Sequence, residues 1–138
     1  MSIHFKMSNP VKVVAAVFKR ENTFLACRRK AGLSNGLQWE FPGGKQKPDE
    51  ASVDALIREI DEELGVQISV GESLGTHVHV YADKAIELQC FLVRDWTGEF
   101  CPIDHDKIEW FKLEDLASIE LSAADVPFVE RISIAVPG

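Results

Sequence analysis

The strongest chemical signal in the sequence is a group of carboxylates that a helix would place on one face. Glu62 and Glu63 follow Glu59 by three and four residues, so all three become neighbours on a helical surface. Their like charges repel one another, and a divalent cation would relieve that repulsion. Oxygen-rich sites suit Mg²⁺ or Mn²⁺, and Mg²⁺ commonly binds through carboxylates together with substrate phosphates. Taken alone, an acidic run of this kind is more typical of a solvated helix face, and metal-assisted phosphate chemistry is the alternative.

Residues at fixed distances from these carboxylates favour the chemical interpretation. Gly43 and Gly44 predict a turn, which could offer a backbone carbonyl as a further metal ligand and let a phosphate approach closely. Arg58 is suited to orient a carboxylate through a bidentate pair, and Glu50 stands eight residues before it. A merely solvated face would not require the glycines, Glu50 and Arg58 at these offsets.

The segment from Gly44 to Val66 resembles the signature of the Nudix hydrolases at every fixed position. That signature is Gly, five residues, Glu, seven residues, Arg-Glu, an aliphatic residue, any residue, Glu-Glu, any residue, Gly and a final aliphatic residue. The run from Gln38 to Lys45 (QWEFPGGK) resembles the one that precedes this motif in MutT-like nucleotide pyrophosphohydrolases. The resemblance extends from about Val13 to Ile132, which is nearly the whole chain.

This resemblance implies an α+β fold, the Nudix α/β/α sandwich with a central mixed β-sheet between helices. It also implies Mg²⁺-dependent attack of water on a nucleoside triphosphate, which yields the monophosphate and pyrophosphate. Glu59 would be a candidate base. The residues implied as catalytic are Glu50, Arg58, Glu59 and Glu62. The implied metal ligands are Gly43 through its carbonyl, Glu59, Glu62, Glu63 and Asp104.

Asp104 enters this set because MutT-like enzymes often carry an acidic residue six positions before a tryptophan. Asp104 lies six residues before Trp110. The alternative is an acidic turn residue, since the same loop also holds His105 and Asp106. Several relatives have the longer Glu at this position.

Substrate-binding residues follow from the same resemblance and from side-chain chemistry. Arg29 matches a position near the nucleotide, although a surface strand arginine is the alternative for it and for Arg28. Phe41 could stack on a base or belong to the core, and Glu40 could take either role. The expected partner is therefore a nucleoside triphosphate, with 8-oxo-dGTP and cytidine nucleotides as the leading substrates.

Asp125 leaves the base open. Guanine-selective MutT proteins carry Asn at the matching position, and an amide both donates and accepts hydrogen bonds. An ionised Asp125 only accepts, so it favours a base edge rich in donors such as the cytosine amino group, or needs protonation to serve an oxidised purine. Its alternative role is a helix N-cap before Pro127.

The hydrophobic pattern predicts strands, one clear helix, more strands and a terminal helix. The helix spans Glu50–Leu64 and has apolar residues at three- and four-residue steps, with Asp49 as N-cap and Gly65 as its end. The predicted strands are Val11–Phe18, Phe24–Arg29, Trp39–Phe41, Gln67–Val70, Leu74–Tyr81, Ile86–Trp96 and Ile108–Leu113. Cys101–Lys107 is a predicted turn, and Leu116 and Ala123–Ile132 carry the last helical pieces.

Composition narrows the class further. The 138 residues fit an N-terminal extension at 1–10 and a single domain at 11–138. A net charge of −7 argues against a stable nucleic-acid partner. No apolar run approaches a membrane span and no signal core is visible, which predicts a cytoplasmic protein with no membrane partner, either monomer or homodimer. Two alternatives to hydrolysis of free nucleoside triphosphates remain. One is an inactive nucleotide-binding module, and the other is an RNA 5′ pyrophosphohydrolase.

Overall fold

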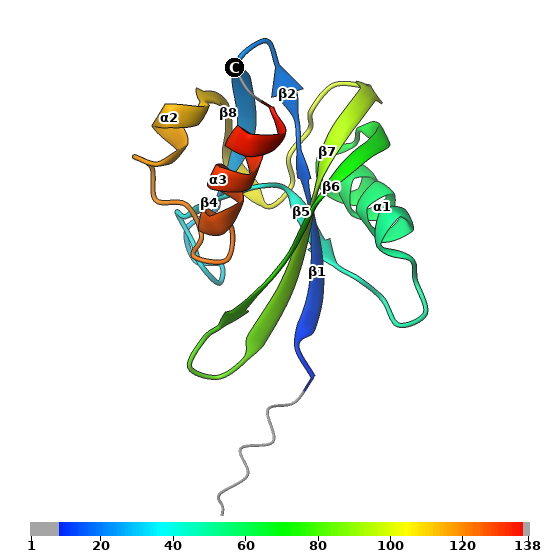
Figure 1. Ribbon diagram of the computed structural model, residues 1–138, viewed down its shortest axis with the longest axis vertical. Helices are drawn as coiled ribbons and strands as arrows, with labels where there is room; N and C mark the ends of the chain where they lie inside the picture. The colour runs from blue at the N-terminus through cyan, green and yellow to red at the C-terminus, as the bar shows by residue number, and fades with distance from the viewer. Residues whose placement is uncertain (1–8, 137–138) are drawn as a thin grey trace, which may run out of the picture.

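A computed structural model describes residues 9–136 of the chain, so most of the expected N-terminal extension lies outside the described residues. Figure 1 shows the chain from its N-terminal strand to its C-terminal helix. The strands are β1 (Val11–Val17), β2 (Lys19–Arg20), β3 (Thr23–Arg29), β4 (Trp39–Glu40), β5 (Gly43–Lys45), β6 (Gln67–Val80), β7 (Ala85–Thr97) and β8 (His105–Lys112). The helices are α1 (Ser52–Leu64), α2 (Leu113–Leu116) and α3 (Val126–Ala135).

Within the described residues the strands form two four-stranded sheets. The first has the order β5-β1-β7-β6 and is mixed, because β1 and β7 run parallel while the other neighbours are antiparallel. The second joins β2, β3 and β4, with β8 paired to β3. Helix α1 lies on one side of the strands, and α2 and α3 lie on the other (Figure 1). This confirms the α+β class and the helix–sheet–helix layers that the sequence predicts.

Strand β1 is the centre of both cores because its two faces are buried. Val14 and Ala16 pack in the cluster that contains the apolar face of α1. Ala15 and Val17 pack in the cluster that contains Phe128 of α3. A strand segment covered on both faces takes apolar residues at successive positions, which explains the hydrophobic run from Val13 to Phe18.

Helix α1 follows its predicted apolar period, but it begins later than the sequence indicates. Its first helical residue is Ser52 and its N-cap is Ala51, so the predictions of Glu50 as the first residue and Asp49 as the cap are wrong. Asp49 instead has a positive φ of 64° in the preceding turn. Gly65 ends the helix as predicted, with a φ of 68° and its N–H bonded to the helix backbone.

Three further predictions of local structure are corrected by long-range pairing. Gly43 and Gly44 are not a turn but part of β5, which pairs antiparallel with β1. The two strands predicted between residues 67 and 81 form the single strand β6. The pairing of β6 with β7 shifts register between Ser69 and Thr76, which is where the sequence predicted a gap between two strands. Strand β8 begins at His105, inside the predicted turn at 101–107.

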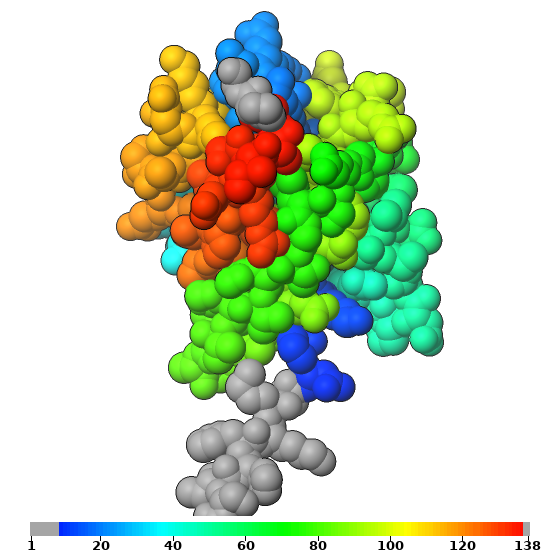
Figure 2. All heavy atoms as spheres, in the orientation of Figure 1, coloured from blue at the N-terminus to red at the C-terminus, as the bar shows by residue number. Residues whose placement is uncertain are grey.

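Helix α3 is held against β6 on the face seen in Figure 2. The Arg131 Nη1 atom donates to the carbonyl oxygens of Leu74 and Thr76, each at 3.1 Å.

Among the described residues, no helix is long and apolar enough to cross a membrane.

Candidate metal and nucleotide site

The carboxylates of α1 meet the backbone of β5 at close range. The Gly43 N–H donates to Oε2 of Glu63 at 3.2 Å. A β-carbon at Gly44 would collide with the Glu59 carboxylate. The glycines therefore allow the backbone to approach closely, as the sequence predicts, but as members of a strand rather than of a turn. This contact aligns the β5 backbone with the acidic face of the helix.

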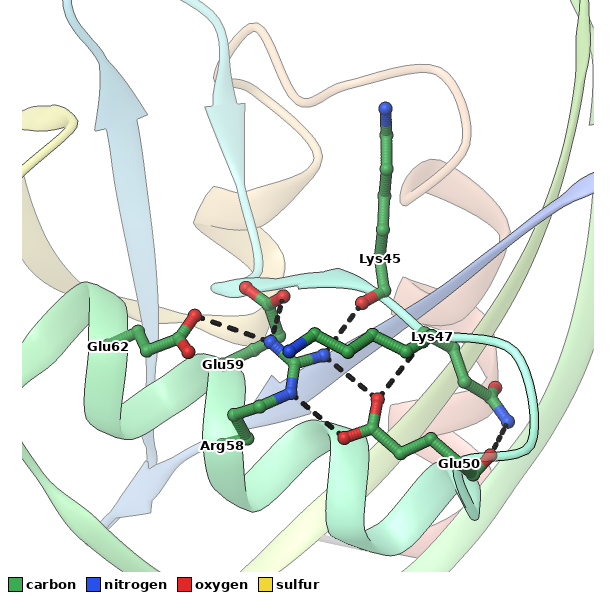
Figure 3. A network of polar contacts seen from close by, with 7 residues as sticks. Lys45, Lys47, Glu50, Arg58, Glu59 and Glu62 are labelled. Atoms are coloured by element: carbon green, nitrogen blue, oxygen red, sulfur yellow. Dashed lines mark hydrogen bonds and ion pairs between the residues drawn. The ribbon is translucent and has the colours of Figure 1, made fainter.

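Arg58 holds the acidic face together through a network drawn in Figure 3. Its Nε and Nη2 atoms donate to the two carboxylate oxygens of Glu50, each at 2.9 Å. Its Nη1 atom donates to Glu59 at 2.8 Å and to Glu62 at 3.3 Å. The remaining bond runs from Nη2 to the Lys45 carbonyl oxygen at 3.1 Å. One guanidinium therefore orients three carboxylates and ties them to β5.

The pKa values of the carboxylates at the two ends of this acidic face shift in opposite directions. Hydrogen bonds from Arg58 and from the Lys47 N–H lower the pKa of Glu50 to about 2. Burial raises the pKa of Glu63 to about 7, with further raising by Glu40 and Glu59 and partial compensation by His105 and the Gly43 N–H. Glu50 is thus a fully compensated carboxylate, whereas Glu63 lacks a matching positive charge.

Glu63 belongs to a second group of ligand atoms that the sequence did not indicate. Glu40, Glu63 and His105 each place one potential ligand atom within 4.8 Å of the others. The His105 Nε2 atom lies 3.0 Å from Oε2 of Glu40. Oxygen and imidazole donors in this arrangement are suited to a divalent cation.

The raised pKa of Glu63 predicts a pH dependence of stability in the metal-free protein. Its ordinary value is 4.5 and its folded value is about 7, so the folded state holds the proton more tightly. The stability that this protonation provides is complete below pH 4.5 and is lost as the pH rises through about 7. Glu63→Gln should remove this loss, because the neutral amide still accepts from the Gly43 N–H. Urea unfolding between about pH 5 and 8 in the presence of a chelator measures this loss of stability. Parallel pH profiles for the two proteins would contradict the prediction.

A cleft of about 350 Å³ lies beside Gly43 and Gly44, next to the acidic face of α1. Its walls come from β1, β3, β4, β5, the β6–β7 hairpin and the segment before α3. The structure brings all four predicted substrate residues to this cleft, together with the predicted ligand Gly43. They are Arg29, Glu40, Phe41 and Asp125. Phe41 packs in the core on the α3 side, being 3% exposed, which is the second of its two predicted roles, and stacking on a base stays a prediction.

Asp125 occupies the N-cap position of α3, but its side chain makes no capping bond. Its Oδ2 atom instead accepts from the Phe41 N–H at 3.2 Å. Burial raises the pKa of Asp125 well above its usual range, and the nearby charge of Glu40 raises it further. Burial therefore favours the neutral carboxyl form, which can donate as well as accept a hydrogen bond.

Asp104 and its neighbours are arranged differently from the predicted metal site. Asp104 is exposed before β8, and its carbonyl oxygen accepts from the Lys30 N–H at 3.1 Å. His105, the next residue, is 3% exposed and points to Glu40. A ligand role for Asp104 stays a prediction. The only sequence signal for His105 was its place beside Asp104, because an isolated histidine in a polar loop does not reveal burial.

Comparison with known proteins places the chain in a family. Residues 8–132 match the NUDIX domain. The chain is 35% identical to the CTP pyrophosphohydrolase of Escherichia coli K12, over 87% of this chain and 89% of that protein. It is 40% identical to the 8-oxo-dGTP diphosphatase of Proteus vulgaris, over 59% of this chain and 71% of that protein.

Solved structures agree with the sequence relatives. The solution structure of the E. coli ORF135 protein matches with a TM-score of 0.84 and 32% identity, covering 99% of each chain. The crystal structure of a MutT NUDIX hydrolase from Burkholderia pseudomallei matches with a TM-score of 0.82 and 27% identity, covering 91% of this chain and 99% of that one. The chain belongs to the Nudix family and is a hydrolase of the MutT-like kind.

Proposed function

We propose that the protein hydrolyses nucleoside triphosphates to the monophosphate and pyrophosphate in a Mg²⁺-dependent reaction. The observation that carries this proposal is the contact between the acidic face of α1 and the glycine backbone of β5, directly beside a cleft of about 350 Å³. Carboxylates supply the metal ligands that phosphate chemistry needs, and a cleft of this size accommodates a nucleotide.

The residues present fit a divalent metal ion. Burial raises the pKa of Glu63, and the neighbouring Glu40 and Glu59 raise it further. A bound cation would offset both effects. Glu59, Glu62, Glu63 and the Gly43 carbonyl would hold the ion. When bound, Mg²⁺ would neutralise phosphate oxygens and favour deprotonation of a bound water. Mn²⁺ is also suited, because it takes the same carboxylate and carbonyl oxygen ligands.

The residues of this chain have distinct expected roles around the phosphates. Arg58 fixes the carboxylates of Glu50, Glu59 and Glu62 relative to β5, so their geometry is set before substrate arrives. Glu59 is the candidate base for the attacking water. Lys45 lines the cleft, and its side chain extends away from the Arg58 network (Figure 3), where its charge can pair with a phosphate.

Base recognition is assigned to the inner wall of the cleft. Phe41 lines the cleft from the core side. A neutral Asp125 would offer an O–H donor to the base, while its Oδ2 atom accepts from the Phe41 N–H. Cytosine and 8-oxoguanine both present an acceptor beside a donor on their pairing edges, so both can be bound by a neutral carboxyl. The named activities of the E. coli and Proteus relatives, on CTP and 8-oxo-dGTP, make these two nucleotides the first to test.

A nucleotide panel tests the function. It contains CTP, dCTP, 5-methyl-dCTP, 8-oxo-dGTP, dGTP, ADP-ribose and diadenosine tetraphosphate, compared by kcat/KM. We expect release of pyrophosphate from a cytidine nucleotide or from 8-oxo-dGTP, dependent on Mg²⁺. Nucleotide binding without release under Mg²⁺ or Mn²⁺ would identify an inactive binding module instead. Faster release from triphosphorylated RNA would assign the site to RNA ends.

Substitutions of Asp125 test its protonated state in the same assay. Asp125→Asn keeps an acceptor for the Phe41 N–H and a donor toward the cleft, so kcat/KM on the preferred nucleotide should stay within about fivefold. Asp125→Leu removes both and should lower kcat/KM by about tenfold or more, since one hydrogen bond contributes roughly that much. If Asp125→Asn loses as much as Asp125→Leu at pH 7, the carboxylate acts in its ionised form and the assignment fails.

A further inference from the structure

His105 is a buried polar residue between the acidic face of α1 and the cleft. Its side chain is 0% exposed, and it is the first residue of β8. The pairing of β3 with β8 shifts register between Arg28 and Arg29, so Arg29 faces His105 across an irregularity. Such a bulge re-aims side chains. The side chain that it turns inward is His105, while Asp104 stays exposed.

The imidazole of His105 contacts one particular oxygen of a cleft residue. Its Nε2 atom lies 3.0 Å from Oε2 of Glu40. The Arg29 Nη1 atom approaches the same oxygen at 3.5 Å, and Arg29 is itself fixed by a bond from its Nε to the Ser34 carbonyl at 3.0 Å. Arg29 and Glu40 line the cleft, whereas His105 does not. His105 therefore reaches the cleft only through Glu40.

The other ring nitrogen of His105 restricts what the ring can do. Among the described residues, Nδ1 is buried and has no hydrogen-bond partner. A carboxylate oxygen accepts, so the contact with Glu40 requires the hydrogen on Nε2. The ring thus makes a single directional bond, and that bond ends on Glu40.

We propose that His105 is a positioning residue, which fixes the Glu40 carboxylate in the wall of the cleft and so contributes to discrimination between nucleobases. The proposal rests on the proposed function, because it assigns the cleft to a nucleotide. Without the Nε2–H donor, Glu40 would keep only the longer contact with Arg29 and would adopt other rotamers. The cost would fall on binding of the preferred base rather than on the chemical step.

The test compares His105→Leu with His105→Gln, whose amide can place a donor close to the Nε2 position. Lys107→Gln, an exposed change on β8, is the matched control. We expect His105→Leu to raise KM for the preferred nucleotide by about tenfold, the effect of one hydrogen bond to a charged group, with kcat changed by less than about threefold. We expect His105→Gln to recover most of the loss. The Kd for Mg²⁺ should be unchanged.

A double-mutant cycle with Glu40→Gln separates positioning from a general structural role. If His105 acts through Glu40, His105→Leu should cost little once Glu40 has been replaced. Additive losses would overturn the proposal. So would a uniform loss on all nucleotides with weaker Mg²⁺ binding, because His105 would then act on the acidic face of α1.

Two controls keep the test decisive. If His105→Leu does not fold, His105→Gln is compared with His105→Asn, whose shorter amide does not reach Glu40; equal selectivity in the two would refute the proposal. If the unmodified protein hydrolyses no nucleotide, the proposed function fails. His105 is then tested by the binding selectivity between non-hydrolysable analogues of CTP and 8-oxo-dGTP, which must change in His105→Leu for the positioning role to stand.

Discussion

Glu62→Gln is expected to lower kcat on the best nucleotide by about a thousandfold or more, because loss of a ligand charge removes several kcal/mol of metal-assisted stabilisation. The fold should tolerate the change. Glu62 is 58% exposed on its side chain, and its one bond here is the 3.3 Å contact from Arg58. An exposed pair of this kind contributes about 1 kcal/mol or less to stability. Steady-state kinetics with Mg²⁺ titration and urea unfolding measure the two effects separately.

The matched control is the neighbouring residue on the same helix. Asp61 bonds to the Gln67 side chain at 2.7 Å rather than to Arg58, so Asp61→Asn removes an adjacent charge without changing a proposed metal ligand. It should leave turnover within about threefold, as surface changes usually do. Full turnover in Glu62→Gln on every nucleotide, or equal losses in both variants, would show that the metal assignment is wrong.

Replacing Gly43 or Gly44 by alanine should give large and contrasting effects. At Gly43 the new β-carbon would collide with the Val14 carbonyl oxygen, which is backbone of β1 and cannot turn aside. The pairing of β5 with β1 must then open, and we expect a loss of stability of about 3 kcal/mol or more. At Gly44 the β-carbon would meet the end of the Glu59 side chain, which can move. Gly44→Ala should therefore fold but lose about a hundredfold in kcat, because Glu59 is displaced.

Chemical denaturation and kinetics on the two alanine variants provide the comparison. The decisive result is the separation: Gly43→Ala changes mainly the free energy of unfolding, and Gly44→Ala changes mainly kcat. Wild-type stability in Gly43→Ala would mean that β5 does not pack against β1 as described. Wild-type turnover in Gly44→Ala would mean that Glu59 has no fixed position in the reaction.

The parts of the molecule that the sequence predicted are those set by local periodicity. The apolar steps along α1 place Leu56, Ile60 and Leu64 in the core. The same helical spacing puts Arg58 beside the glutamates, and the structure confirms its bidentate pair with Glu50. The strand predicted at Val11–Phe18 is confirmed as β1, which the structure buries on both faces from Val14 onward.

The parts that the sequence missed depend on residues brought together from distant segments. A pair of glycines predicts a turn locally, and only the partner strand β1 makes Gly43 and Gly44 extended. The bond from His105 to Glu40 joins residues 65 positions apart in the chain, and a local hydrophobic pattern cannot predict such a contact. The raised pKa of Asp125 follows from burial, which is a property of the packed domain rather than of the residue. The sequence could therefore offer a protonated Asp125 only as one of two alternatives.

The parallel pairing of β1 with β7 also sets when the site can exist during synthesis. Val11 to Val17 pairs with residues 86–92, so the strand that supports Gly43 and Gly44 acquires its other neighbour only after the whole segment from Gly44 to Val66 has been translated. Contacts at this sequence separation form late because the intervening loop must first be closed. A nascent chain that ends at residue 84 thus contains every carboxylate of α1 but lacks β7, the strand that pairs with β1. The cleft beside them is complete only once Asp125, the last of its lining residues in the sequence, has been synthesised.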